Sequence, residues 1–293
     1  MSITSAMYTG VSGLLANAEG INVIGNNLSN VNTIGFKQSR MLFSDMLSTS
    51  VGNNSQIGHG IQIQKVDNVF SQGSLESTTS VTDLAIQGDG FFALGGPGAA
   101  AGTAIAPANA YYTRSGSFRL DSTGLGLVNP DGYKVLDTAG KPIVFAATDG
   151  VVAPNTKNFQ KVVGVDPSGT ISLLYADAAG NTSTLFYAGA GAVPAAAVAG
   201  AVKLAQTNVP NPAGMAKQGG TMFTLTAQSG APAALTAPNG TSEKLLSNNL
   251  ELGNVDMATE FVNMITTQRA YSANSKTITT ADEMTQEVLG LKR

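Results

Sequence analysis

The chain has 293 residues, enough for one large domain or two small ones with a buried core. Only 12% of the residues are charged, against a usual share of roughly 25%, and the formal net charge of −3 provides no basic field for a phosphate backbone. We therefore expect no nucleic-acid partner. The absence of cysteine excludes a disulfide framework, a thiolate nucleophile and a Cys-type zinc site.

Apolar runs in the sequence fall far short of the roughly 18 residues that span a bilayer, so we expect no membrane insertion. The N-terminus lacks the positively charged region and compact apolar core of a Sec-type signal peptide. If the protein leaves the cell, we expect another export route without a cleaved signal peptide.

Residues 3–31 are predicted to form a helix with an apolar seam of period 3.5, typical of lengthwise helix packing. The seam consists of Met7, Val11, Leu14, Ala18, Ile21, Gly25 and Leu28. Glycine interrupts the same segment at positions 10, 13, 20 and 25, and each glycine costs about 1 kcal/mol relative to alanine. We therefore expect this helix to need neighbours for stability.

The stretch "NNLSNVNTIGFK", residues 26–37, ends this helix and begins a predicted connector, residues 31–70. Asparagine can cap turns and form hydrogen bonds without bringing charge, and Gly35 permits a positive φ. Phe36 is a candidate anchor, although a helix stop with a buried phenylalanine is a compatible alternative. Lys37 is the first basic residue of the chain. The candidate connector residues are Asn26, Asn27, Asn30, Asn32, Gly35, Phe36 and Lys37.

The middle of the chain reads as antiparallel β structure, because no strand–helix–strand alternation appears. In "TMFTLTAQ", Phe223, Leu225 and Ala227 alternate with polar residues, which predicts a half-buried strand. Residues 117–145 read as short strands separated by DSTG, NPDG and DTAG turns, and residues 170–189 as a hairpin. The Gly- and Ala-rich tracts 95–110 and 188–202 are predicted loops.

A second long helix is predicted near the C-terminus, because residues 254–289 contain neither glycine nor proline. It would be about 54 Å long, with Asn254 or Asp256 as its N-cap. Its apolar pattern comprises Met257, Met264, Tyr271 and Ile278 at intervals of seven, with Phe261, Ile265, Ala281 and Val288 beside them. The predicted fold class is α+β: terminal helices, 1–30 and 254–293, pair as a coiled-coil-like stalk, and a mainly antiparallel β domain spans 71–253.

Catalytic chemistry finds little support in the sequence. His59 is the only histidine and lies between glycines, and the "GDG" at 88–90 lacks the spacing of a phosphate loop or calcium loop. The aspartates at 83, 89, 121 and 131 lie at or near predicted turns, where aspartate caps its own backbone. We expect no enzyme, and no catalytic, cofactor-binding or metal-binding residues.

Two features argue that the terminal helices pack against copies of themselves, rather than forming only an intramolecular core. The C-terminal helix exceeds the width of a small β domain, and residues 1–36 contain a single charged side chain, Glu19. A solvated helix face normally carries Lys and Glu. The two apolar patterns above are therefore the candidate assembly interface.

The segments 23–47 and 250–293 resemble the N- and C-terminal signatures of the bacterial flagellar rod and hook proteins. The segments "SQGSLESTTSVTDLAIQGDGFFAL" (71–94) and "YYTRSGSFRLDSTGLGLVNPDGYKVL" (111–136) resemble β segments of that family. The compact connection 47–60, the segment 206–232 and the "LGLKR" ending are closer to short hook proteins with a single β domain. The resemblance thus favours a hook subunit, with a distal rod subunit as the alternative.

The resemblance implies self-assembly into a helical tube that encloses an export channel, bends as a universal joint and transmits motor torque to the filament. It further implies an extracellular location in the basal body and hook, reached by flagellar type III export. Expected partners are further copies of the chain, the rod, the hook cap, the hook–filament junction proteins and the export apparatus. The four glycines of the first helix and the polar faces of the second also lead us to expect that both helices are disordered or loosely ordered in the free chain and fold on assembly. An adhesin with a helical stalk remains a competing class.

Overall fold

The computed structural model describes residues 3–46, 49–52, 55–151, 156–230, 234–238 and 243–291. The chain forms two compact units. The helical unit comprises Met1–Val31, Gln38–Val69 and Val255–Arg293, and the β unit comprises Asn32–Lys37 and Phe70–Asn254. The fold class is α+β, as predicted, and the segment expected as a connector contributes to both units.

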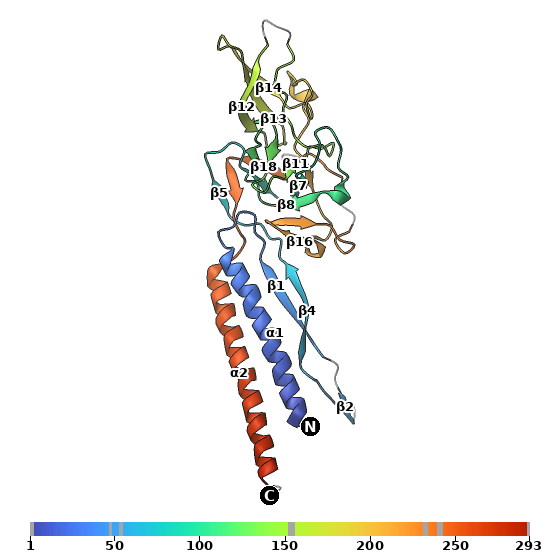
Figure 1. Cartoon of the computed structure of the whole chain (residues 1–293), viewed down its shortest axis with the longest axis vertical. Helices are drawn as coiled ribbons and strands as arrows, with labels where there is room; N and C mark the ends of the chain where they lie inside the picture. Colours follow the sequence, from blue (N-terminus) through green and yellow to red (C-terminus); the bar gives the residue numbers. More distant parts are fainter. Residues whose placement is uncertain are drawn as a thin grey trace. The chain divides into compact units, whose positions relative to one another are not determined.

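The helical unit contains two long helices that lie side by side, α1 (Ile3–Ser29) and α2 (Met257–Gly290) (Figure 1). Asp256 is the N-cap of α2: its carboxylate accepts hydrogen bonds from the Ala258 amide (2.9 Å) and the Thr259 hydroxyl (2.8 Å). These bonds satisfy donors that the first helical turn leaves unpaired, and they hold the pKa of the exposed Asp256 carboxyl below its ordinary value. Asp256, one of the two predicted caps, is thus confirmed.

A β-hairpin lies beside α1 in the same unit (Figure 1). Its strands β1 (Ser39–Asp45) and β4 (Ile61–Asn68) pair antiparallel, with an irregularity between Leu42 and Phe43. Two further short strands, β2 (Thr49–Gly52) and β3 (Ser55–Ile57), pair beyond it. Part of the 47–60 connection, and Lys292 and Arg293 of the "LGLKR" ending, lie outside the described residues.

The β unit is antiparallel throughout its described strand pairs. An eight-stranded sheet has the order β16-β17-β8-β7-β11-β10-β9, with β15 added to β7. Its strands are β7 (Phe91–Gly95), β8 (Tyr111–Thr113), β9 (Arg119–Leu120), β10 (Leu127–Val128), β11 (Lys134–Val135), β15 (Gln206–Thr207), β16 (Ala216–Gly219) and β17 (Met222–Thr224).

The β unit also contains one three-stranded sheet and two sheets of two strands each. The former has the order β12-β13-β14, with β12 (Asn158–Val165), β13 (Ile171–Ala176) and β14 (Thr182–Phe186). The latter pair β18 (Lys244–Ser247) with β6 (Leu84–Gln87), and β19 (Asn249–Glu251) with β5 (Leu75–Ser77). Short 3-10 turns cover Pro107–Asn109, Val198–Gly200 and Pro212–Gly214.

Two apolar clusters form the core of the β unit. The larger joins the three-stranded sheet to the eight-stranded one, since Leu173 and Tyr175 of β13 pack in the same cluster as Phe92 and Leu94 of β7. The smaller lies on the other face of β7 and contains Phe91, Ala93, Tyr112 and Phe223. Strand β7 is buried along its full length, which explains its continuous apolar run.

The predicted turns are built as the sequence indicated. Asp121 Oδ1 accepts from the amides of Thr123 and Gly126 (both 3.1 Å), and Asp137 Oδ1 accepts from Ala139 and Lys141 (both 2.9 Å). The hairpin predicted at 170–189 is confirmed as β13 and β14.

The strand predicted from the alternation at 222–228 is wrong in extent. It ends at Thr224, and both Met222 and Phe223 are buried. The Ser229 hydroxyl accepts from the Thr226 amide (3.0 Å) and donates to the Thr226 carbonyl (2.7 Å), closing a local turn. Such side chain–backbone bonds compete with strand pairing.

Candidate assembly surfaces

The helices α1 and α2 meet through the smallest side chains of α1. Its buried positions are Gly10, Gly13, Ala16, Gly20 and Asn27. A Cβ on Gly10 would lie 2.9 Å from Ile278 Cγ1, and one on Gly13 would lie 2.7 Å from Asn274 Nδ2. The glycines that weaken α1 as an isolated helix therefore provide its close approach to α2.

The contacts between the two helices keep one register along their length. Gly10 faces Ile278, Gly13 faces Asn274, Gly20 faces Thr267, and Asn27 hydrogen-bonds Glu260. In each pair the two residue numbers sum to 287 or 288, so the helices run antiparallel without slippage. The pairing of the terminal helices is thus built on a glycine face that the apolar seam did not predict.

The predicted seam of α1 lies beside this buried face and is only partly covered. Met7, Leu14, Ala18, Ile21 and Leu28 are half-buried, whereas Val11 is exposed. The physical reason is the small size of the glycines, which brings the helix backbones together and leaves the larger side chains at the flanks.

The predicted pattern of α2 divides in the same way. Its inner members Met264, Tyr271 and Ile278 are half-buried and Ala281 is buried, all at the spacing of the residues that contact α1. Four predicted members are about half exposed: Met257 (52%), Phe261 (49%), Ile265 (50%) and Val288 (57%). Within the helical unit these four side chains find little cover.

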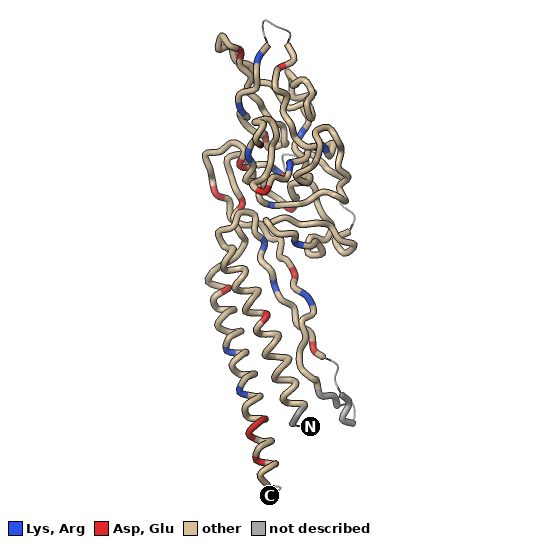
Figure 2. The backbone as a smooth tube through the Cα atoms, in the orientation of Figure 1, with Lys and Arg blue, Asp and Glu red and all other residues tan. Residues whose placement is uncertain are grey.

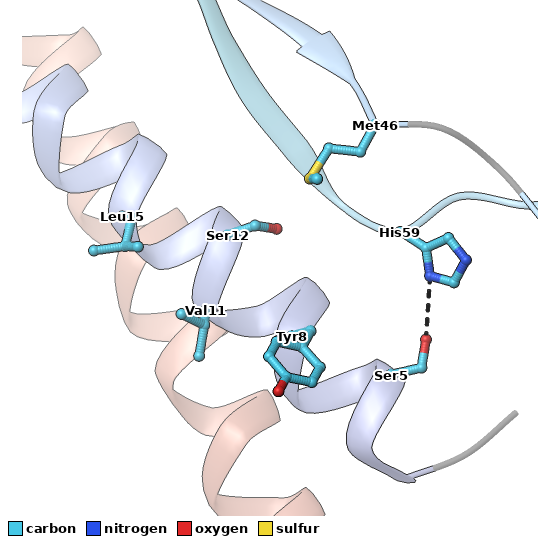
Figure 3. Close-up of a pocket in the computed structure, with 7 residues that line it drawn as sticks. All are labelled: Ser5, Tyr8, Val11, Ser12, Leu15, Met46 and His59. Atoms are coloured by element: carbon cyan, nitrogen blue, oxygen red, sulfur yellow. Dashed lines mark hydrogen bonds between the residues drawn. The ribbon is translucent and has the colours of Figure 1, made fainter.

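An apolar pocket of about 520 Å³ lies between α1 and the ends of the hairpin (Figure 3). Tyr8, Val11 and Leu15 line it from α1, and Met46 and His59 from the hairpin. The Ser5 hydroxyl lies 3.5 Å from His59 Nδ1 at its rim. With Tyr8 75% and Leu15 63% exposed, this is an open apolar surface. His59 is thus a lining residue of an apolar surface.

Asn27 fastens the end of α1 to the start of β1. Its side chain is buried, accepts from the Ser39 amide (2.9 Å) and donates to the Ser39 carbonyl (2.8 Å). Its amide nitrogen also lies 3.4 Å from Glu260 Oε2 of α2. One uncharged side chain thus links three elements. Asn26 and Asn32 are exposed, and Asn30 bonds back to the Asn26 carbonyl.

The "GFK" residues of the predicted connector belong to the β unit. Gly35 has φ +67°, and a Cβ there would overlap the Ser115 backbone, so only glycine fits. Its amide donates to the Glu251 carbonyl (2.7 Å). Phe36 is buried, with the Lys217 ammonium 5.0 Å from its ring centre. Burial lowers the pKa of Lys217.

Lys37 forms a buried ionic cluster with Glu251 and Arg114. Lys37 Nζ donates to Glu251 Oε1 (2.6 Å) and to the Ser71 carbonyl (2.7 Å), and Arg114 Nη1 lies 3.4 Å from Glu251 Oε2. Burial lowers the pKa of Lys37, and the neighbouring Glu251 carboxylate opposes that effect. Lys37 therefore directs its charge into its own chain.

Glu251 and Arg114 were not predicted as site residues. Glu251 also accepts from the Gly73 amide (2.9 Å), and Arg114 lies over the Phe91 ring at 4.9 Å. Their partners are distant in sequence, so no local period marks them. The one available signal was that both charged residues fall within the predicted β domain, 71–253, of a chain poor in charge.

Three protein-family models match the sequence of this chain. The family model "Flagella basal body rod protein" matches residues 7–37. "Flagellar hook protein FlgE/F/G D1 domain" matches residues 85–173, and "Flagellar basal body rod FlgEFG protein C-terminal" matches residues 246–291. The matches cover most of α1, all of α2 and roughly the first half of the β unit.

Individual relatives extend the similarity along the chain. The flagellar basal-body rod protein FlgG of Bacillus subtilis is 36% identical over 98% of this chain and 99% of its own length. That of Caulobacter vibrioides is 32% identical over 98% and 99%. The flagellar hook protein FlgE of Borreliella burgdorferi is 35% identical over 49% of this chain and 34% of its own length.

The chain belongs to the flagellar rod and hook protein family. This family consists of structural proteins of the bacterial flagellum rather than enzymes, and its members are part of the basal body and hook. In the described part of the chain, no helix is both long and apolar enough to cross a membrane.

Proposed function

We propose that this protein is a structural subunit of the distal flagellar rod, which assembles with its own copies into a rigid, hollow drive shaft. The observation that carries this proposal is similarity along nearly the whole chain, 95–98%, to proteins named as basal-body rod proteins. The similarity to a hook protein covers 49% of the chain. The rod, which is the alternative that the family resemblance left open, is thus better supported than the hook.

The proposed assembly surfaces are the partly covered apolar residues of the helices and the pocket beside α1. Met257, Phe261, Ile265 and Val288 on α2, with Val11 on α1, present apolar area that the chain itself does not bury. Burying such area against another copy contributes about 25 cal/mol per Å² before association costs. We assign the helical unit to the inner tube and the β unit to contacts further out, with export by the flagellar type III route.

The test is the location and shape of the assembled protein. Immunogold labelling of basal bodies isolated from the source bacterium is expected to mark the rod, and purified protein is expected to form short straight tubes by electron microscopy. Long curved tubes, with label beyond the outer membrane, would instead support the hook, together with its cap and hook–filament junction partners. Absence of any polymer would contradict both and favour an adhesin with a helical stalk.

A further inference from the structure

Helix α2 carries a row of four charged side chains on the face turned away from α1. Lys276 lies midway between Asn274 and Ile278, which both contact α1, so at about 100° per residue it points to the opposite side. Along that face the charged residues are Arg269, Lys276, Glu283 and Glu287, at successive intervals of seven, seven and four residues. All four side chains are exposed. Figure 2 shows the basic residues of α2 followed by acidic ones toward its C-terminal end.

These four charges have no ionic partner within the described part of the chain. The ion pairs there join Lys37 to Glu251, Lys65 to Asp67, and Arg114 to Glu251. Asp282, a neighbouring acidic residue, points elsewhere and accepts from the Gln286 side chain at 2.9 Å. The two basic side chains line a shallow groove of about 440 Å³ together with Ile265, Gln268, Ser272 and Ala273.

The order of the signs makes this face complementary to itself. Two positive residues are followed by two negative ones, so sliding one copy of α2 along another brings opposite charges level. Arg269 and Glu283 are 14 residues apart, and Lys276 and Glu287 are 11 apart. At about 1.5 Å per residue, these separations correspond to a shift of roughly 17–21 Å.

We propose that the charge row Arg269, Lys276, Glu283 and Glu287 sets the axial offset between neighbouring copies of this chain. The basic pair of one α2 meets the acidic pair of a parallel α2 displaced by roughly 17–21 Å. The proposal rests on the proposed function, because a polymer of equivalent subunits carries its α2 helices in one direction.

A second copy fits this row better than a partner with one sign of charge. A basic or an acidic partner would be attracted by one half of the row and repelled by the other half. Helix α1 cannot balance the row from a neighbour either, because Glu19 is the single charged residue among residues 1–36 and it already accepts from Asn22 (3.0 Å). Each copy also offers equal numbers of both signs, so an interior row is neutral when every copy is paired.

The test uses two full-length variants in which all four side chains of the charge row have the same sign of charge. R269E/K276E has four acidic side chains on this face, and E283K/E287K has four basic ones. At about 0.01–0.05 M salt, where the Debye length exceeds about 10 Å, we expect each variant alone to raise the critical concentration for assembly by about tenfold or more. An equimolar mixture of the two is expected to assemble like the wild type, since opposite rows can then alternate.

The mixture separates the inference from a folding defect, because two misfolded variants would not rescue each other. R119E/K161E changes the net charge as much as R269E/K276E, but on exposed positions of the β unit outside the row, and is expected to raise the critical concentration less than R269E/K276E does. If both single-sign variants assemble as well as the wild type, or the mixture gains nothing over them, the inference is overturned. If the wild type itself forms no polymer, the proposed function fails instead.

Cross-linking tests the direction of the pairing. The chain has no cysteine, so K276C/E287C provides the sole thiols. In a parallel, offset assembly a short bismaleimide should join successive copies into a ladder of covalent multimers, which K276C alone cannot give. An antiparallel pair would bring Lys276 beside Glu283 instead. The parallel offset would therefore be overturned by two results together. K276C/E283C would give covalent dimers without a ladder, and K276C/E287C would give no ladder.

Discussion

Lys37 and Glu251 are 214 residues apart in sequence, yet their side chains meet at 2.6 Å and neither is exposed. The carboxylate of Glu251 is shared: Lys37 and the Gly73 amide bond to Oε1, and Arg114 lies nearest to Oε2. The backbone adds to this link, since Gly35 donates to the Glu251 carbonyl. The segment after α1 and the segment before α2 are thus held together inside the β unit.

Replacing Glu251 should destabilise the protein more than replacing Lys37. Glu251→Gln leaves the buried Lys37 without its ion-pair partner and removes the nearest counter-charge of the buried Arg114, so we expect a loss of about 3–5 kcal/mol in the free energy of unfolding. Lys37→Met leaves Glu251 paired with Arg114 and the Gly73 amide, so the expected loss is about 1–2 kcal/mol. Urea denaturation followed by circular dichroism measures both. Equal losses would show that Glu251 does not serve both cations.

The lowered pKa of Lys37 predicts a pH dependence of stability. Burial lowers the folded-state pKa below the ordinary value of 10.5, so between these two values the unfolded chain binds more protons at this site than the folded chain. The contribution of Lys37 to stability therefore rises with pH in that window and is complete above 10.5. The free energy of unfolding of the wild type, minus that of Lys37→Met, should increase as pH approaches 10.5. A difference that falls over this range would contradict the lowered pKa.

Alanine substitutions at Gly35 and Gly25 should have opposite effects. A Cβ at Gly35 would overlap the Ser115 backbone in a left-handed conformation, and we expect Gly35→Ala to cost at least about 2 kcal/mol. Gly25 lies within α1, and nothing lies within 4 Å of an added Cβ, so Gly25→Ala should stabilise by up to about 1 kcal/mol through helix propensity. Thermal unfolding of the two variants measures the contrast. A destabilised Gly25→Ala would mean that another requirement holds that glycine.

The helix ends, the β segments and their turns could be predicted because their signals are local. Asp256 as a cap and Asp121 and Asp137 in turns follow from side chains that bond to their own neighbouring backbone. The contact face of α1 could not be predicted from hydrophobicity, because Gly10 and Gly13 pack by being small. Apolar periodicity located the flanks of the interface instead.

Contacts between residues that are distant in sequence could not be predicted either. Asn27 is one of several asparagines near the end of α1, but its partners Ser39 and Glu260 lie on two other elements. Nothing in a single sequence distinguishes this buried asparagine from the exposed Asn26. The same holds for Glu251, whose neighbours in space come from three distant segments.

Asn27→Asp should be strongly destabilising although it barely changes the shape of the side chain. The new carboxylate loses the donor to the Ser39 carbonyl and lies beside the buried Glu260, so we expect a cost of about 2–4 kcal/mol at pH 7. In the double variant N27D/E260Q, the amide group introduced at position 260 can donate a hydrogen bond to the carboxylate introduced at position 27. This variant should therefore recover a large part of the lost stability. Urea denaturation measures the coupling between the two positions. Additive effects would show that Asn27 and Glu260 do not interact.

Amide exchange should show that the helices of the free chain are less protected than the β unit. The buried positions of α1 are mainly glycine and alanine, which bury little apolar surface, while Tyr8 and Leu15 remain exposed. Amides of residues 3–28 should therefore exchange faster in the monomer than those of Phe92, Tyr112 and Leu173, which lie in the β core. In the assembled polymer, residues 3–28 should become protected, because neighbouring copies then cover the exposed flanks. Strong protection of these residues in the monomer would contradict folding on assembly and would mean that the glycine face alone holds the helix pair.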